Sequence, residues 1–96
     1  MKYAAVIEYL QDAEVVNAHR PAHRAYLAGL LAEGKLAASG PFVDGFGALI
    51  VYEADSLEAA EALIQNDPFK AAGVFLRWTV REWKVVISSP TAMTVA

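Results

Sequence analysis

The stretch KYAAVIEYL, residues 2 to 10, decides the fold class. Its side chains alternate between two sets, Tyr3, Ala5, Ile7 and Tyr9 on one face and Ala4, Val6, Glu8 and Leu10 on the other. This period of two is typical of a β-strand, and both faces are largely apolar. A strand of this kind has to be covered on both sides, so it predicts a sheet with helices on one face and a second cover on the other.

The remaining elements follow from periodicity and turn signals. A stripe of Tyr26, Leu27, Leu30 and Leu31, ended by Gly34, predicts a helix over residues 19–33. The expected later elements are a hairpin of strands over 35–42 and 48–54, a helix over 56–66 with a capping box from Asp55 to Glu58, and a strand over 74–86 with Val74, Leu76, Trp78 and Val80 on its apolar face.

This order, β-α-β-β-α-β, predicts a ferredoxin-like α+β fold: a four-stranded antiparallel sheet with two helices on one face. We expect one domain over residues 1–86 and a C-terminal tail over 87–96. Because two helices cover only one face of the sheet, the economical cover for the other face is a second copy of the chain. The sequence therefore predicts a C2 homodimer with its sheets face to face.

Composition excludes several classes of function. The chain has 96 residues, 56% of them hydrophobic, a net charge of −3 and no basic run, so we expect no nucleic-acid partner. It has no cysteine, which excludes disulfides and thiolate chemistry and fits a reducing compartment. The first residues lack the apolar run of a signal peptide. We therefore expect a cytoplasmic protein with no membrane partner.

His23, in the stretch RPAHRAYL of residues 20 to 27, is the first candidate for chemistry. It precedes Leu27 by four residues, so its ring points toward the sheet as either a packed core histidine or an acid–base group. His19 forms an i, i+4 pair with it. We expect no metal site there, because Pro21 places the start of the helix near residue 20 and no third ligand is evident. Arg20 and Arg24 flank the ring as solvated side chains or as holders of a ligand anion.

Asp67, in NDPFKAAG, is the candidate acid, and a purely structural role also explains it. Asp at an N-cap, Pro68 next and Gly73 as a stop describe a short helical turn. We expect the C-terminal ends of both long helices to point the same way, which places residue 67 far from the start of the first helix. Topology alone then does not pair Asp67 with His23, unless the loop folds back or a dimer partner supplies the contact.

Ser39, in Ser39-Gly40-Pro41, presents a hydroxyl where a strand turns into a loop. No GxSxG motif surrounds it, so a ligand hydrogen bond is a better interpretation than a serine nucleophile.

Three linked segments carry a family resemblance. RPAHRAYLAGLLAEGKLAASGP, ALIVYEADSLEAAEALIQNDPFKAAGVF and VREWKVV resemble the YCII-related proteins over about residues 2 to 86. The resemblance implies a homodimer of the dimeric α/β barrel group and a cleft with a His–Asp acid–base pair, here His23 and Asp67, with Ser39 nearby. The loop after SGP is only FVDGFG here, shorter than in many relatives, and the tail falls outside the pattern.

The activity implied by the resemblance is that of a cofactor-independent lyase or isomerase acting on a small ring compound, for example dehydrochlorination of a chlorinated hydroquinone. In it His23 moves a proton, Asp67 orients the ring and Ser39 donates a hydrogen bond to the substrate. From the residues themselves we also expect Arg20 and Arg24 to bind the substrate. Possible aromatic walls are Tyr3, Tyr9, Phe42, Phe69, Trp78 and Trp83. Two alternatives stay open: a non-catalytic dimer that binds a small ligand, and a structural dimer in which the backbone satisfies His23.

Overall fold

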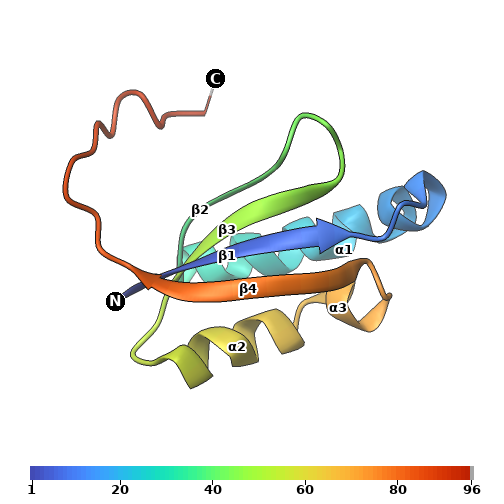
Figure 1. Cartoon of the computed structure of the whole chain (residues 1–96), viewed down its shortest axis with the longest axis horizontal. Coiled ribbons are helices and arrows are strands. Elements are labelled where there is room, and N and C mark those ends of the chain that lie inside the picture. Colours follow the sequence, from blue (N-terminus) through green and yellow to red (C-terminus); the bar gives the residue numbers. More distant parts are fainter. Residues whose placement is uncertain (96) are drawn as a thin grey trace.

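The computed structural model describes residues 1–95 (Figure 1). Ala96, the last residue of the expected tail, lies outside the described residues. The elements are β1 (Lys2–Tyr9), α1 (Ala13–Ala32), β2 (Leu36–Pro41), β3 (Gly47–Glu53), α2 (Leu57–Gln65), α3 (Pro68–Ala71) and β4 (Phe75–Trp83).

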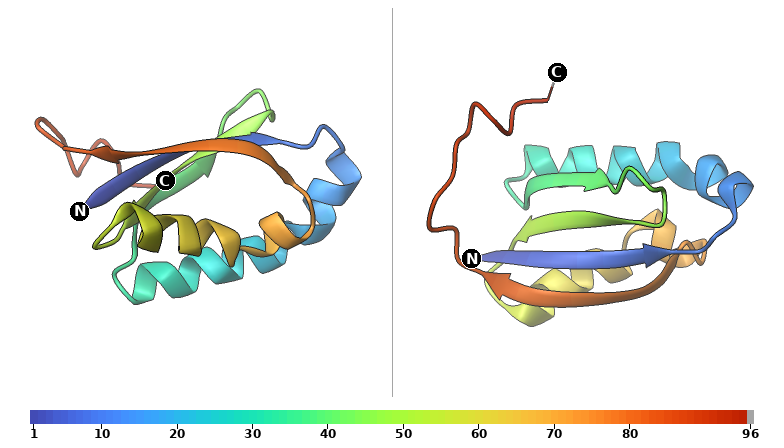
Figure 2. Two further views of the ribbon diagram at one scale, coloured as in Figure 1. Left: turned by 60° about the horizontal axis from the view of Figure 1, so that its bottom comes forward. Right: turned by 45° about the horizontal axis from the view of Figure 1, so that its top comes forward.

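The four strands form one antiparallel sheet in the order β2-β3-β1-β4. The helices lie together on one face of it, as the left view of Figure 2 shows. This arrangement confirms the predicted ferredoxin-like α+β fold. In β1 the predicted alternation holds, because Tyr3, Ala5, Ile7 and Tyr9 are all buried beneath the helices.

The inward face of β4 differs from the prediction at one end. The register between β1 and β4 shifts between Glu8 and Tyr9, so that Tyr9 pairs with Phe75. Phe75 is therefore buried on the helix side, whereas Leu76, which was expected there, is 47% exposed. A bulge of this kind moves one residue to the opposite face, which simple alternation cannot anticipate.

Two predicted helix starts are wrong. Helix α1 begins at Ala13, six residues before the expected start, and Asp12 caps it by accepting a hydrogen bond from the Val15 amide. Pro21 lies inside this helix, where it has no amide to donate to the preceding turn. Helix α2 is capped by Ser56 and not by Asp55, since the Ser56 hydroxyl accepts from the Ala59 amide.

The relative direction of the helices also corrects the prediction. Since β1 and β3 are antiparallel, the helix that follows each strand runs back in the opposite sense, so α1 and α2 are antiparallel to each other (Figure 1). The end of α2, continued by α3, therefore lies at the same end of the molecule as the first half of α1. This geometry brings residue 67 to His23 within one chain.

The sheet face opposite the helices carries exposed apolar side chains. Val6 on β1, Leu49 on β3 and Trp83 at the end of β4 are 46%, 39% and 48% exposed. Their alternation with the buried residues of the same strands places all three on the side away from the helices.

Among residues 1–95, no helix combines the length and the apolar composition that crossing a bilayer requires.

Candidate functional site

His23 and Asp67 form a buried pair. The ring nitrogen Nδ1 of His23 lies 2.8 Å from both carboxylate oxygens of Asp67. The exposed fractions are 6% for His23 and 1% for Asp67. A buried carboxylate needs hydrogen-bond donors, and Nδ1 of His23 supplies one to Asp67. The topological argument from the sequence did not predict this contact.

The local sequence holds Asp67 in place. Asp67 is the N-cap of α3, and its Oδ1 accepts a hydrogen bond of 2.8 Å from the Phe69 amide. Pro68 occupies the first helical position, where its missing amide costs nothing. The Phe69 ring then stacks on the His23 ring with a centroid distance of 4.0 Å and an interplanar angle of 10°. One short turn therefore orients both the acid and the imidazole.

This geometry selects the tautomer of the neutral His23 ring. An ionised carboxylate only accepts hydrogen bonds, so Nδ1 carries the proton that it donates to Asp67. In the neutral ring Nε2 is then an acceptor. A histidine with an acceptor Nε2 and a carboxylate behind Nδ1 has the arrangement of a general base.

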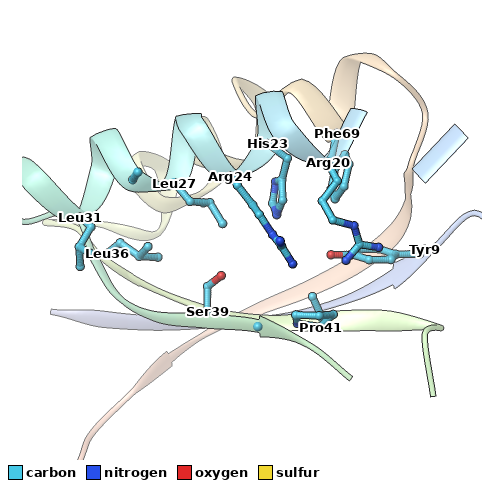
Figure 3. Close-up of a pocket in the computed structure, with 13 residues that line it drawn as sticks. Tyr9, Arg20, His23, Arg24, Leu27, Leu31, Leu36, Ser39, Pro41 and Phe69 are labelled. Atoms are coloured by element: carbon cyan, nitrogen blue, oxygen red, sulfur yellow. The ribbon is translucent and has the colours of Figure 1, made fainter. Parts of the chain in front are cut away.

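A pocket of about 310 Å³ lies between α1 and β2, and the His23 ring forms part of its wall (Figure 3). Ser39 pairs with Ile50 across the β2–β3 ladder, which puts both side chains on the helix side of the sheet. The Ser39 hydroxyl therefore faces α1 and lines the pocket. The structure thus gathers His23, Ser39, Arg20 and Arg24 around one cavity, with Asp67 behind the ring.

Arg20 and Arg24 extend from α1 toward the sheet, Arg20 toward Tyr9 and Arg24 toward Ser39 and Pro41 (Figure 3). Burial raises the pKa of the Tyr9 phenol, and Asp67 adds to this, while Arg20 and Arg24 act in the opposite direction. The hydroxyl therefore stays protonated at neutral pH and can donate a hydrogen bond into the pocket.

Of the six aromatic walls that the sequence suggested, Tyr9 and Phe69 line this pocket. Phe42 and Trp83 instead line a groove on the opposite sheet face, beside the C-terminal tail. Trp78 packs against the core and donates from Nε1 to the Glu61 carboxylate. The apolar walls Leu36 and Pro41 were not singled out from the sequence. They are five residues apart, and only the irregularity between Leu36 and Ala38 puts both on the helix side, which simple alternation cannot anticipate.

His19 stands on the same continuous helix as His23, so Pro21 does not separate the two as the sequence argument supposed. His19 is exposed, whereas the His23 ring is buried and contacts Asp67 through Nδ1. Within residues 1–95, no cluster of three or more His, Cys, Asp or Glu side chains is placed to hold a metal ion.

The fold and site define a ferredoxin-like α+β protein with a buried His–Asp pair beside a small pocket. The model of the YCII-related domain matches residues 1–84, and the chain belongs to that family. It is 43% identical over 77 residues to the protein YciI of Escherichia coli, covering 70% of this chain and 79% of that protein. It is also 42% identical over 67 residues to the uncharacterized protein YjpA of Bacillus subtilis, covering 70% and 78%.

A solved structure shares the fold. The 5-chloro-2-hydroxyhydroquinone dehydrochlorinase TftG of Burkholderia phenoliruptrix, in complex with 2,5-dihydroxybenzoquinone, superposes with a TM-score of 0.78 at 29% identity. The match covers 88% of this chain and 94% of TftG.

Proposed function

We propose that this protein is a small cofactor-independent enzyme of lyase or isomerase type. His23 acts as the general acid–base, Asp67 orients it, and the pocket between α1 and β2 binds a small cyclic metabolite through Ser39, Arg20 and Arg24. The observation that carries the proposal is the pair of 2.8 Å contacts between Nδ1 of His23 and the Asp67 carboxylate, in a ring that lines the pocket.

The proposed step is a proton transfer. The acceptor Nε2 takes a proton from an acidic O–H or C–H group of the substrate, and the electron pair of that bond passes into the conjugated ring. In an elimination from a halogenated hydroquinone, the proton is first returned to the ring carbon that carries the halogen, and a second O–H proton is then removed. The electron pair of that O–H bond forms a C=O bond, a ring double bond shifts onto the halogen-bearing carbon, and the halide leaves with its bonding pair, so that the net change is loss of HX. In an isomerisation, the proton returns to another atom of the same molecule.

The chemistry of a relative supports this class of reaction. TftG is a dehydrochlorinase, and its complex contains a hydroxylated benzoquinone. Loss of HCl from a chlorinated hydroquinone is an elimination that needs acid–base groups and no electron acceptor. The supporting similarity extends over 88% of this chain.

The test is chloride release from 5-chloro-2-hydroxyhydroquinone, with His23→Asn and Asp67→Asn as variants. We expect turnover in the wild type and a loss of about 100-fold or more in kcat for His23→Asn, as is typical when a general base is removed. In Asp67→Asn, ¹⁵N NMR should show the proton of the His23 ring moving from Nδ1 to Nε2. Normal turnover in His23→Asn would refute the proposal, and tight binding without any turnover would favour a non-catalytic ligand-binding protein.

We further propose that a second copy of the chain covers the open sheet face, giving a homodimer. The exposed side chains of Val6, Leu49 and Trp83 support it, since a monomer would leave them in water. We also propose that the family domain ends near residue 86 and that 87–96 form a tail, because β4 ends at Trp83 and the family match ends at residue 84. The lack of cysteine supports a cytoplasmic location.

A further inference from the structure

The pocket beside His23 has a charge opposite to that of the chain as a whole. The protein carries a net charge of −3, with 11 acidic side chains. The pocket lining nevertheless includes Arg20 and Arg24 and no aspartate or glutamate. Among the ion pairs of residues 1–95, none involves either arginine. Neither arginine is therefore paired with a carboxylate of the described part of the chain, and the acid behind the pocket wall, Asp67, is held by His23.

Arg20 also has an unused donor. Its Nε is buried and has no hydrogen-bond partner within residues 1–95. A buried N–H without a partner costs free energy, and no water-sized group reaches this one. A ligand would instead meet the outer N–H groups of the guanidinium, which extend toward Tyr9 (Figure 3). Because the guanidinium presents several N–H groups in one plane, it suits a planar, delocalised oxyanion better than a neutral group.

Two hydroxyl groups add further donors to the pocket, those of Tyr9 and Ser39. The Tyr9 phenol stays protonated and lies by the Arg20 guanidinium, and the Ser39 hydroxyl faces the same space (Figure 3). Leu27, Leu36 and Phe69 provide apolar walls. The volume of about 310 Å³ is at the small end of ligand pockets, which suits a molecule with a single ring.

We infer that the pocket binds a monocyclic organic oxyanion, a ring enolate, phenolate or carboxylate, whose charged oxygen lies between Arg20 and Arg24. This inference rests on the proposed function and names its substrate class. It also gives the arginines a second role. When Nε2 of His23 removes a proton, negative charge develops on the ring oxygens, and fixed guanidinium groups stabilise that charge without having to reorganise.

Calorimetric titration with three ring compounds tests the inference. The probes are 2,5-dihydroxybenzoquinone, which ionises, 2,5-dimethoxybenzoquinone, which has the same ring and cannot ionise, and benzoate, which supplies a carboxylate. We expect the dihydroxyquinone or benzoate to bind at least tenfold more tightly than the dimethoxyquinone. Whichever of the two binds more tightly identifies the source of the oxyanion. Equal affinity for all three would overturn the inference.

Variants assign the effect to the arginines. Arg20→Gln and Arg24→Gln should each weaken binding of the anion about tenfold or more, while the corresponding lysine variants should recover part of it. Lys84→Gln removes one positive charge outside the pocket and should leave the affinity unchanged. Wild-type affinity in both glutamine variants would overturn the inference.

His23→Asn separates this inference from the proposed function. It should keep the affinity for the anion within a few fold while losing chloride release. If His23→Asn loses turnover but the arginine variants bind normally, the acid–base function stands and the ligand class is wrong. If the anion binds through the arginines and no turnover occurs in the wild type, the ligand class is supported and the proposed reaction fails.

Discussion

Replacing Asp67 by alanine removes two interactions at once, and the structure allows each to be estimated. The carboxylate caps α3 through the Phe69 amide, and loss of an N-cap costs about 1 kcal/mol. It also accepts a charge-assisted hydrogen bond from Nδ1 of His23, which contributes about 1.5 to 3 kcal/mol. Because both groups are buried, water cannot replace either bond. We therefore expect Asp67→Ala to lower the free energy of unfolding by about 3 kcal/mol.

Asp67→Asn separates the two contributions. The amide oxygen can still accept from the Phe69 amide, so the cap is kept, and only a neutral hydrogen bond to His23 replaces the charged one. The expected cost is about 1 to 2 kcal/mol. His23→Phe supplies the other side of a double-mutant cycle, since a phenyl ring can keep the stacking on Phe69. In the His23→Phe background, Asp67→Ala should cost only the cap, about 1 kcal/mol.

Urea unfolding followed by tryptophan fluorescence measures these differences. All variants are compared at the same protomer concentration, because any dimer contributes to the apparent stability. The m-value should stay constant, so that shifts in midpoint report stability alone. If Asp67→Ala costs the same free energy with and without His23, the two side chains are not coupled in solution, and the reasoning from the 2.8 Å contacts is refuted.

Three further predictions concern the framework. The Tyr52 hydroxyl is buried without a partner among residues 1–95, so Tyr52→Phe should stabilise the protein by about 1 to 2 kcal/mol in urea unfolding. Burial also raises the pKa of Tyr52, so the wild type should lose stability as the pH rises above about 10, and Tyr52→Phe should lose less. If Tyr52→Phe is less stable than the wild type, the hydroxyl is not an unpaired buried group. A Cβ on Gly47 would collide with the Ile7 carbonyl, so Gly47→Ala should lower the free energy of unfolding by at least about 2 kcal/mol. The control is Gly29→Ala, which has open space and a helical backbone and should leave stability unchanged or raise it. Thermal unfolding measures both. Val6→Lys should shift sedimentation from dimer to monomer at micromolar concentration, and a wild type that already sediments as a monomer would refute the proposed dimer.

The fold was predictable, because the apolar alternation of the first strand and the order of elements can both be recognised in the sequence. The start of the first helix could not be predicted in the same way. Residues 13 to 18 contain only Val15 and Val16 as large apolar side chains, and Pro21 resembles a start signal. Asp12 was the overlooked signal, since it caps the helix ahead of an acidic first turn. The burial of Phe75 in place of Leu76 depends on a bulge against β1, which is a property of two strands together.

The residues of the candidate site were predictable from their spacing and turn signals, whereas their pairing was implied only by the family resemblance. His23 followed from its spacing to Leu27, and Asp67 from the turn NDPF. The topological argument did not pair them, because it took the two helices to end on the same side of the sheet. In an antiparallel β-α-β-β-α-β sheet the two helices must run in opposite directions, so the end of the second lies beside the first half of the first. Correct topological reasoning would therefore have predicted the contact between His23 and Asp67.

The position of the cap links the fold to the proposed chemistry. Asp67 is the N-cap residue directly before α3, and its backbone is extended. Its Oδ1 accepts a hydrogen bond from the Phe69 amide two residues on. The same carboxylate holds Nδ1 of His23, and the Phe69 ring that follows stacks on the imidazole. A shift of α3 by one residue would move the acid and the stacking ring together. The orientation of the His23 ring is therefore determined by a helix-capping motif, and a variant that weakens the cap should disturb stability and the tautomer of His23 in parallel.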